Sequence, residues 1–253
     1  MSPSKTSGNY AGKPVGISSS PVIPMSSSEA IFNSPPAFYL KLLRTLPRTT
    51  KLTASLPLDK SLRILFKRAI DIIVSGIMIV AVLSWLLPII ALLIKIDSKG
   101  PVFFLQKRSG CNGRLFSCIK FRSMIRNTEA DLRPASEGDE RITRLGKFLR
   151  NHYLDELPQF FNVLMGDMSV IGPRPHMISD NLKYEEVISY YDFRHKVKPG
   201  ITGLAQVLGF AGPVDDIQKM KDRVQLDIFY IRHWSLMLDT KIILRTIGKL
   251  FGS

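Results

Sequence analysis

Two adjacent acids, Asp155 and Glu156, are the residues of this sequence best suited to chemistry. Pro158 follows almost at once, and proline is favoured at the first position of a helix because its missing N–H needs no partner there. The pattern predicts a helix that begins near Pro158, runs through residues 159–165 and stops at Gly166. Both carboxylates would lie at the positive end of this helix, where anions are stabilised and stay ionised. Capping of the helix is the alternative role for such acids.

A single arginine held between two prolines follows the expected helix. Gly172-Pro173-Arg174-Pro175 predicts a stiff loop, and arginine forks onto phosphate oxygens. A fixed guanidinium near two carboxylates favours a substrate that carries phosphate. Two further cations, Lys120 and Arg122, stand at the end of an expected strand, where they are either surface charges or phosphate contacts.

The composition points to an anionic partner. The 35 Lys and Arg outnumber the 21 Asp and Glu, which gives a net charge of +14. Nucleic acid, an anionic membrane surface and phosphorylated substrates all fit such a charge. The two cysteines and four histidines follow no metal-ligand spacing, so no zinc-type site is expected.

One apolar segment decides among these partners. Residues 72–94 contain no charge over 23 positions, and about 20 apolar residues span a bilayer. Membrane contact is therefore expected and nucleic-acid binding is not. Pro88 interrupts the segment and must bend or break a helix there, and Ser84, one turn earlier, can bond to a freed backbone group. Both flanks are basic, and basic flanks stay on the cytoplasmic side. A re-entrant helix hairpin that returns to the same face is therefore favoured over a full crossing.

The rest of the chain predicts an α+β, mostly helical fold around the acids. Residues 101–105 and 115–119 read as a small β-hairpin, because glycines at 110 and 113 mark a turn between them. A basic amphipathic pattern over 142–149 predicts a helix that lies on a membrane surface or covers the core. The pattern over 231–251 predicts helices that lie on a membrane surface. Further predicted elements are helices over 180–191 and 215–230, a short strand over 204–208 and a loop over 127–140.

Three regions follow from this reading. Residues 1–60 are rich in serine and proline and are expected to be disordered, because they cannot bury enough apolar surface to offset the ordering entropy. Residues 61–97 form the re-entrant membrane hairpin. Residues 98–253 form a cytosolic catalytic domain with interfacial helices. Two acids stand near apolar or basic surroundings, and both Asp71 and Asp239 are expected to pair with a neighbouring base.

Six blocks in a fixed order make the match to a family specific. They are KRAIDIIVSG with the later Pro88, GPVFFLQKRSG, KFRSM, RLGKFLRNHYLDELPQFFNVLMGDMSVIGPRP, VKPGITGLAQV and YIRHWSLMLDTKII. Over roughly residues 62–251 the chain resembles the bacterial sugar transferases that initiate polysaccharide synthesis, the monotopic phosphoglycosyl transferases. The resemblance implies transfer of a sugar 1-phosphate from a UDP-sugar to undecaprenyl phosphate, with release of UMP, at the cytoplasmic face of the cell inner membrane.

The resemblance also implies roles for single residues. Asp155 is the expected nucleophile, which forms a phosphosugar–aspartyl intermediate, and Glu156 with Asp155 is expected to hold Mg²⁺. Ser84 and Pro88 match the family's membrane-hairpin break. The expected substrate- and phosphate-binding residues are Lys120, Arg122, Arg150, Arg174 and Gln206, with Asp239 as a supporting acid. Anionic membrane lipid is a further expected partner, and a homodimer is left open.

The sequence departs from the family pattern in ways that leave alternatives. The block before the acids usually reads Lys-Thr-Ser-Leu, whereas residues 151–154 read Asn-His-Tyr-Leu. Many relatives carry an arginine shortly after GITGLAQV, and residues 208–211 contain none. A catalytically inactive membrane scaffold is therefore one alternative. The segment after GITGLAQV favours UDP-glucose or UDP-galactose as donor by analogy, with a UDP-N-acetylated sugar as the other option.

Overall fold

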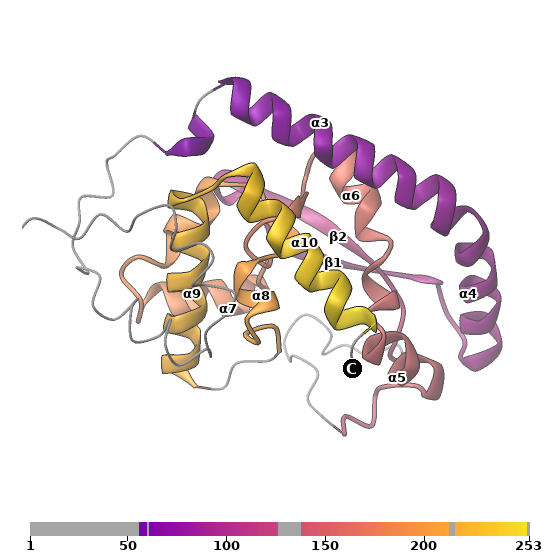
Figure 1. Ribbon diagram of the computed structural model, residues 1–253. Coiled ribbons are helices and arrows are strands. Elements are labelled where there is room, and N and C mark those ends of the chain that lie inside the picture. The colour runs from indigo at the N-terminus through magenta and orange to yellow at the C-terminus, as the bar shows by residue number, and fades with distance from the viewer. Residues whose placement is uncertain (1–55, 60, 126–137, 213–215, 252–253) are drawn as a thin grey trace, which may run out of the picture.

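The computed structural model describes residues 56–59, 61–125, 138–212 and 216–251. The disorder predicted for 1–60 and most of the loop predicted for 127–140 therefore lie outside the described residues. Figure 1 shows a long, bent helical segment that passes over a mostly helical body with a small β-hairpin inside it. The predicted α+β, mostly helical class is confirmed.

The apolar segment forms a helix that bends. Helix α3 (Ser61–Ile77), the π-helical segment η2 (Met78–Leu83) and helix α4 (Ser84–Asp97) follow without a gap, and Figure 1 shows that α3 and α4 run in clearly different directions. Over these 37 residues the mean hydropathy of the most apolar window is 2.9, and only 17% of that window is buried, which is unlike the core helix of a soluble protein.

The irregular turn lies earlier than the sequence predicted. Pro88 is inside α4, and the π-helical turn ends just before Ser84. Within that turn two backbone carbonyls accept hydrogen bonds from side chains. The Ser84 hydroxyl donates to Val80 O (2.6 Å), and Trp85 Nε1 donates to Ala81 O (2.9 Å). The predicted role of Ser84 as a donor to the backbone is thus seen. The irregular backbone is thus π-helical and lies before the proline, and π-bulges are a common cause of helix kinks.

Polar side chains attach α3 to the rest of the domain. The expected ion pair of Asp239 is present, since Lys67 Nζ lies 2.8 Å from its carboxylate. Asp71 accepts hydrogen bonds from the Ser169 hydroxyl and the Val170 N–H, each at 2.9 Å. The base predicted beside it is Lys67, whose charge opposes the rise that burial causes in the pKa of Asp71. These buried contacts fix the direction in which the apolar helix leaves the domain.

The predicted β-hairpin is present. Strands β1 (Phe103–Ser109) and β2 (Leu115–Phe121) are antiparallel, and 3-10 turn η3 (Cys111–Gly113) joins them. In this register Gln106 pairs with Cys118 and Phe104 with Lys120. Cross-strand partners share a face of a sheet, so Lys120 projects on the same side as Arg108, two residues beyond Gln106.

Helix α6 (Gln159–Met165) has the bounds that the sequence predicted, with Pro158 before it and Gly166 after it in a left-handed conformation (φ 93°). Asn162 ties this helix to the outer edge of β2. Its side chain is fully buried, donates to Ser117 O (2.8 Å) and accepts from Ile119 N–H (2.9 Å). The Asn162 amide therefore pairs with two backbone groups at the edge of β2 and holds the neighbouring Lys120 close to α6.

A second small sheet was not predicted. Strands β3 (Ser169–Ile171) and β4 (Gly200–Thr202) are parallel. A side chain at Gly200 would meet Gly172 N at 2.0 Å, so the two loops can pack this closely only with glycine there. The strand predicted for 204–208 is wrong, because Leu204–Val207 forms helix α8. A short apolar run reads the same in a buried strand and a buried helical turn.

The remaining helices surround this core. The helix predicted for 180–191 ends early, because α7 (Ile178–Glu185) stops at Glu185 and the 3-10 helix η5 (Tyr191–Lys196) begins only at the last predicted residue. The helix predicted for 215–230 is α9 (Ile217–Arg232), and the C-terminal amphipathic pattern is α10 (Leu236–Phe251). The others are η1 (Pro57–Asp59), α5 (Arg144–Asn151) and η4 (Leu154–Glu156).

Candidate functional site

The two acids occupy a single 3-10 turn, η4, between α5 and α6. Tyr153 precedes this turn in a left-handed conformation (φ 57°), which is uncommon for a bulky residue. The reversal brings the chain from α5 into the turn so that Asp155 and Glu156 both face inward, each with only 8% of its surface exposed. Local backbone strain therefore lies directly beside the candidate catalytic residues.

Two cations hold Glu156. Lys120 Nζ and Arg174 Nη2 each lie 2.6 Å from Glu156 Oε1, and Arg174 Nη1 donates to Oε2 at 3.1 Å. Burial alone would raise the pKa of Glu156, but the charges of Arg174 and Lys120 outweigh it and hold this pKa well below its usual range. Glu156 in turn raises the pKa of Arg174. Glu156 is thus an ionised anchor for two cationic side chains.

Asp155 has a different environment. In the part of the chain that the structure describes, no residue donates a hydrogen bond to its carboxylate. Burial raises its pKa, the charge of Lys120 opposes that rise, and the neighbouring charge of Glu156 adds to it, while Arg150 and Arg174 also oppose it. A carboxylate without hydrogen-bond donors and with a raised pKa is a stronger nucleophile than an ordinary, solvated aspartate.

A small hollow opens between these groups. Its lining includes Lys120, Glu156 and Arg174, which the sequence singled out, and it also includes residues that sequence reasoning missed: Arg108, Cys118, Gln159 and Pro175. Arg108 could have been found from the hairpin, because it lies on the same face as Lys120 once the strand register is known. The surface around the acids is therefore strongly cationic, as a phosphate-bearing substrate requires.

Two of the predicted binding residues do not join this cluster. The phosphate contact predicted for Arg122 is corrected, because its guanidinium donates to Ser98 O (2.6 Å) and Ile94 O (3.2 Å) and so binds the end of α4. Residues two positions apart share a face of a continuous strand, but β2 ends at Phe121, between Lys120 and Arg122. Arg122 therefore lies beyond the strand, with its guanidinium at the end of α4. The side-chain amide of Gln206, in α8, donates instead to Ile201 O of β4 (2.9 Å).

Arg150 lies near Asp155, whereas Asp239 belongs to a separate buried group. Arg150 ends α5 and lies close enough to lower the pKa of Asp155 by its charge. Asp239 is one member of a buried polar group in which Lys67, Tyr230 and Trp234 all donate to its carboxylate. Asp239 therefore helps to fix α3 against the domain, through Lys67, and has no contact with the acid pair among the described residues.

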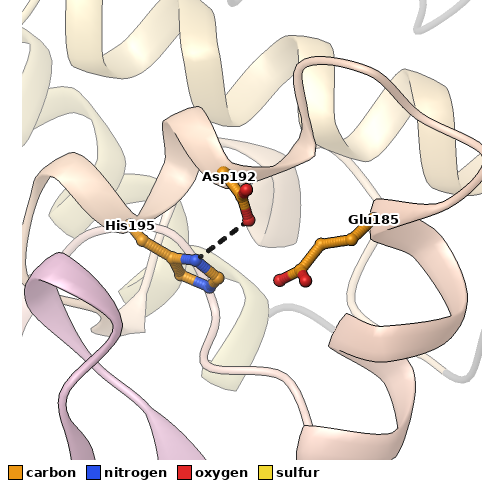
Figure 2. Close-up of side chains that lie close together, drawn as sticks. All are labelled: Glu185, Asp192 and His195. Carbon is orange, nitrogen blue, oxygen red and sulfur yellow. Dashed lines mark ion pairs between the residues drawn. The ribbon is translucent and has the colours of Figure 1, made fainter.

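A second group of titratable residues lies on other elements. Figure 2 shows Glu185, at the end of α7, pointing toward Asp192 and His195 of η5. Their candidate ligand atoms all lie within 4.8 Å of one another, and His195 Nδ1 is 3.7 Å from Asp192 Oδ1. Glu185 and Asp192 are exposed, and exposed acids of this kind are common without a metal ion. The cluster joins the end of α7 to η5, and we assign it no metal site.

Comparison with known proteins places this geometry in a family. A family model described as bacterial sugar transferase matches residues 62–253. The chain is 50% identical over 191 residues to a UDP-glucose:undecaprenyl-phosphate glucose-1-phosphate transferase of Klebsiella pneumoniae, covering 75% of this chain and 41% of that protein. It is 43% identical over 195 residues to a protein of the same name from Caulobacter vibrioides, covering 77% of this chain and 73% of that protein.

A third relative carries a different sugar in its name. The chain is 45% identical over 183 residues to a UDP-N-acetylgalactosamine-undecaprenyl-phosphate N-acetylgalactosaminephosphotransferase of Aeromonas hydrophila, covering 72% of this chain and 42% of that protein. The chain thus spans about two fifths of the length of several curated relatives that it matches.

Proposed function

Because the chain belongs to the bacterial sugar transferase family, we propose that it transfers a hexose 1-phosphate from a UDP-hexose to undecaprenyl phosphate and releases UMP. The names of the relatives support this reaction. The observation that carries it to this chain is the acid pair, in which two cations hold Glu156 while Asp155 accepts no hydrogen bond from a described residue. The product would begin the membrane stage of exopolysaccharide, capsule or O-antigen synthesis.

In the first step, a carboxylate oxygen of Asp155 attacks the phosphorus that carries the sugar. The bond from that phosphorus to the bridging oxygen breaks, and UMP leaves with the electron pair. Lys120 and Arg174 stand beside the acids and offset the negative charge that would otherwise repel a carboxylate from a diphosphate. The enzyme then carries the sugar phosphate on Asp155 as an acyl phosphate.

In the second step, a phosphate oxygen of undecaprenyl phosphate attacks the same phosphorus and frees Asp155. Splitting the transfer in two means that the soluble donor and the lipid acceptor need not be bound together. The acid pair also fits Mg²⁺, which takes one or two carboxylates together with substrate phosphates. Among the described residues none donates a hydrogen bond to the Asp155 carboxylate, and Glu156 Oε2 accepts one, from Arg174 Nη1 at 3.1 Å. When bound, Mg²⁺ would supply further charge neutralisation at the diphosphate.

We propose that the protein is monotopic and lies at the cytoplasmic face of the inner membrane. The bend at η2, the exposed apolar surface of α3 and α4 and the basic flanks support a re-entrant hairpin. Apolar side chains exposed on α10, among them Leu244 and Ile247, support a helix that lies at an anionic lipid surface. Cysteines introduced at Ser61 and Ser98 are expected to react from the same, cytoplasmic side of the membrane, and labelling from opposite sides would contradict the hairpin.

The donor sugar is open to direct test. Purified protein in lipid nanodiscs with undecaprenyl phosphate and Mg²⁺ is expected to release UMP from UDP-glucose faster than from UDP-galactose. UDP-N-acetylgalactosamine is the competing donor, because the Aeromonas hydrophila relative is named for it. If it is the best donor, the hexose assignment is wrong. Absence of UMP release from every UDP-sugar in the panel would favour the inactive scaffold.

A further inference from the structure

The loop that presents Arg174 is fixed through its carbonyl groups. Pro173 and Pro175 have no N–H, so the carbonyls are the main backbone groups by which the loop can be held. In chain order, the carbonyls of residues 173–175 accept from Gly200 N–H at 2.9 Å, Arg194 Nη2 at 2.7 Å and Arg108 Nη1 at 3.0 Å. Three different elements, β4, η5 and β1, therefore determine where this loop lies.

Arg194 is the donor to Arg174 itself, and its own orientation is restricted. Only 3% of its surface is exposed, and its Nη2 also lies 2.9 Å from Asp227 Oδ2 of α9. Its other terminal nitrogen lies against His176 and Tyr191. One guanidinium thus joins a buried carboxylate to the backbone of the residue whose side chain forks onto Glu156.

The surroundings show why this link matters. Buried ion pairs contribute little net stability once desolvation is counted, and a role in fixing one geometry is a frequent alternative. The side chain of Arg174 retains 28% exposure, so its position is set by its backbone and by Glu156 more than by packing. A misplacement of about 1 Å can reduce the rate about 100-fold when a group must meet a transferring phosphate.

We propose that Arg194 is a positioning residue, which holds the backbone of Arg174 so that its guanidinium can bind Glu156 and the donor phosphate together. This inference rests on the proposed function for the identity of the donor. It assigns Arg194 no contact with substrate. We expect Arg194 to act on turnover through Arg174, with its largest effect on binding of the UDP-sugar.

Arg194→Lys is the most informative change. Lysine keeps the positive charge opposite Asp227, but an ammonium cannot reproduce the planar fork that reaches the carboxylate and the Arg174 carbonyl at once. We expect the KM for the UDP-sugar to rise at least about 10-fold, while the KM for undecaprenyl phosphate changes less than about twofold. Asp227→Asn keeps the side-chain volume and the arginine, and we expect a smaller change in the same direction.

Arg141→Lys is the matched control, because it also loses an arginine fork onto an aspartate, Asp139, in a pair outside the acid cluster. It should leave both KM values unchanged. A purely structural role for Arg194 predicts a lower kcat and an unchanged KM for the UDP-sugar. That result would overturn the proposal. UDP binding, measured by calorimetry, separates the two ideas: weaker binding to Arg194→Lys supports positioning even if UMP release by the parent protein fails, whereas equal binding contradicts it.

Discussion

Replacing Asp155 by asparagine is expected to lower UMP release at least about 1,000-fold, because the amide cannot form the bond to phosphorus on which covalent catalysis depends. The change is nearly isosteric, and Asp155 accepts no hydrogen bond from a described residue, so little stability should be lost. Mass spectrometry of the parent protein mixed with UDP-sugar alone should show a phosphosugar adduct on Asp155. The variant should show none.

The matched control for this change is Asp192→Asn, which alters an exposed carboxylate on η5 and should leave turnover intact. A second measurement uses the pKa of Asp155. Because burial raises it, and because only the ionised form attacks, activity should fall on the acid side at a pH above the ordinary aspartate pKa of 3.8. Normal turnover by Asp155→Asn would remove the nucleophile from the mechanism.

The elements that the sequence predicted well are those with local signals. Pro158 and Gly166 mark the two ends of α6, and the helix bounds follow from backbone chemistry at those two residues alone. Glycine-rich turns likewise place the β-hairpin. The convergence of Lys120 and Arg174 on Glu156 could be expected from charge type, although its distances depend on the tertiary fold.

The missed features depend on contacts between distant residues. The pairing of β3 with β4 joins segments about 30 residues apart in the chain, through strands only three residues long. Arg122 and Lys120 carry the same charge two positions apart in the sequence. Lys120 pairs with Glu156 and Arg122 with carbonyls at the end of α4, and this difference depends on where β2 ends. Asn162 looks like an ordinary polar residue in α6 until the edge of β2 is placed beside it.

Arg194 shows the same limit for the site. In the sequence it stands in a mixed-charge segment, Asp192-Phe193-Arg194-His195, just beyond the helix predicted for 180–191, and it received no predicted role. Its burial follows from α9, which brings Asp227 beneath it. Residues that act by contacting substrate can be inferred from their type and spacing, whereas those that position them become visible only when the packing is known.

Glu156→Gln is expected to affect both stability and activity, because the glutamate compensates two cations. The amide keeps the shape but leaves Lys120 and Arg174 without their counter-charge, and removing one partner of a buried pair is strongly destabilising. Arg174 keeps 28% exposure and Lys120 16%, so solvent screening should reduce the loss to about 2–3 kcal/mol. Turnover should fall about 100- to 1,000-fold, because the ligand that we propose for Mg²⁺ and the anchor of Arg174 are lost together.

A compensating double variant separates these two effects. Lys120→Met removes one of the uncompensated cations, so Glu156→Gln combined with Lys120→Met should recover part of the thermal stability that Glu156→Gln loses, measured by tryptophan fluorescence in detergent. UMP release should not recover, because the double variant has lost both the carboxylate and a cation that we propose binds phosphate. Glu186→Gln, at an exposed position after α7, is the control and should change neither property. Recovery of activity together with stability would mean that Glu156 serves the fold alone, and that the chemistry needs only Asp155 and the remaining cations.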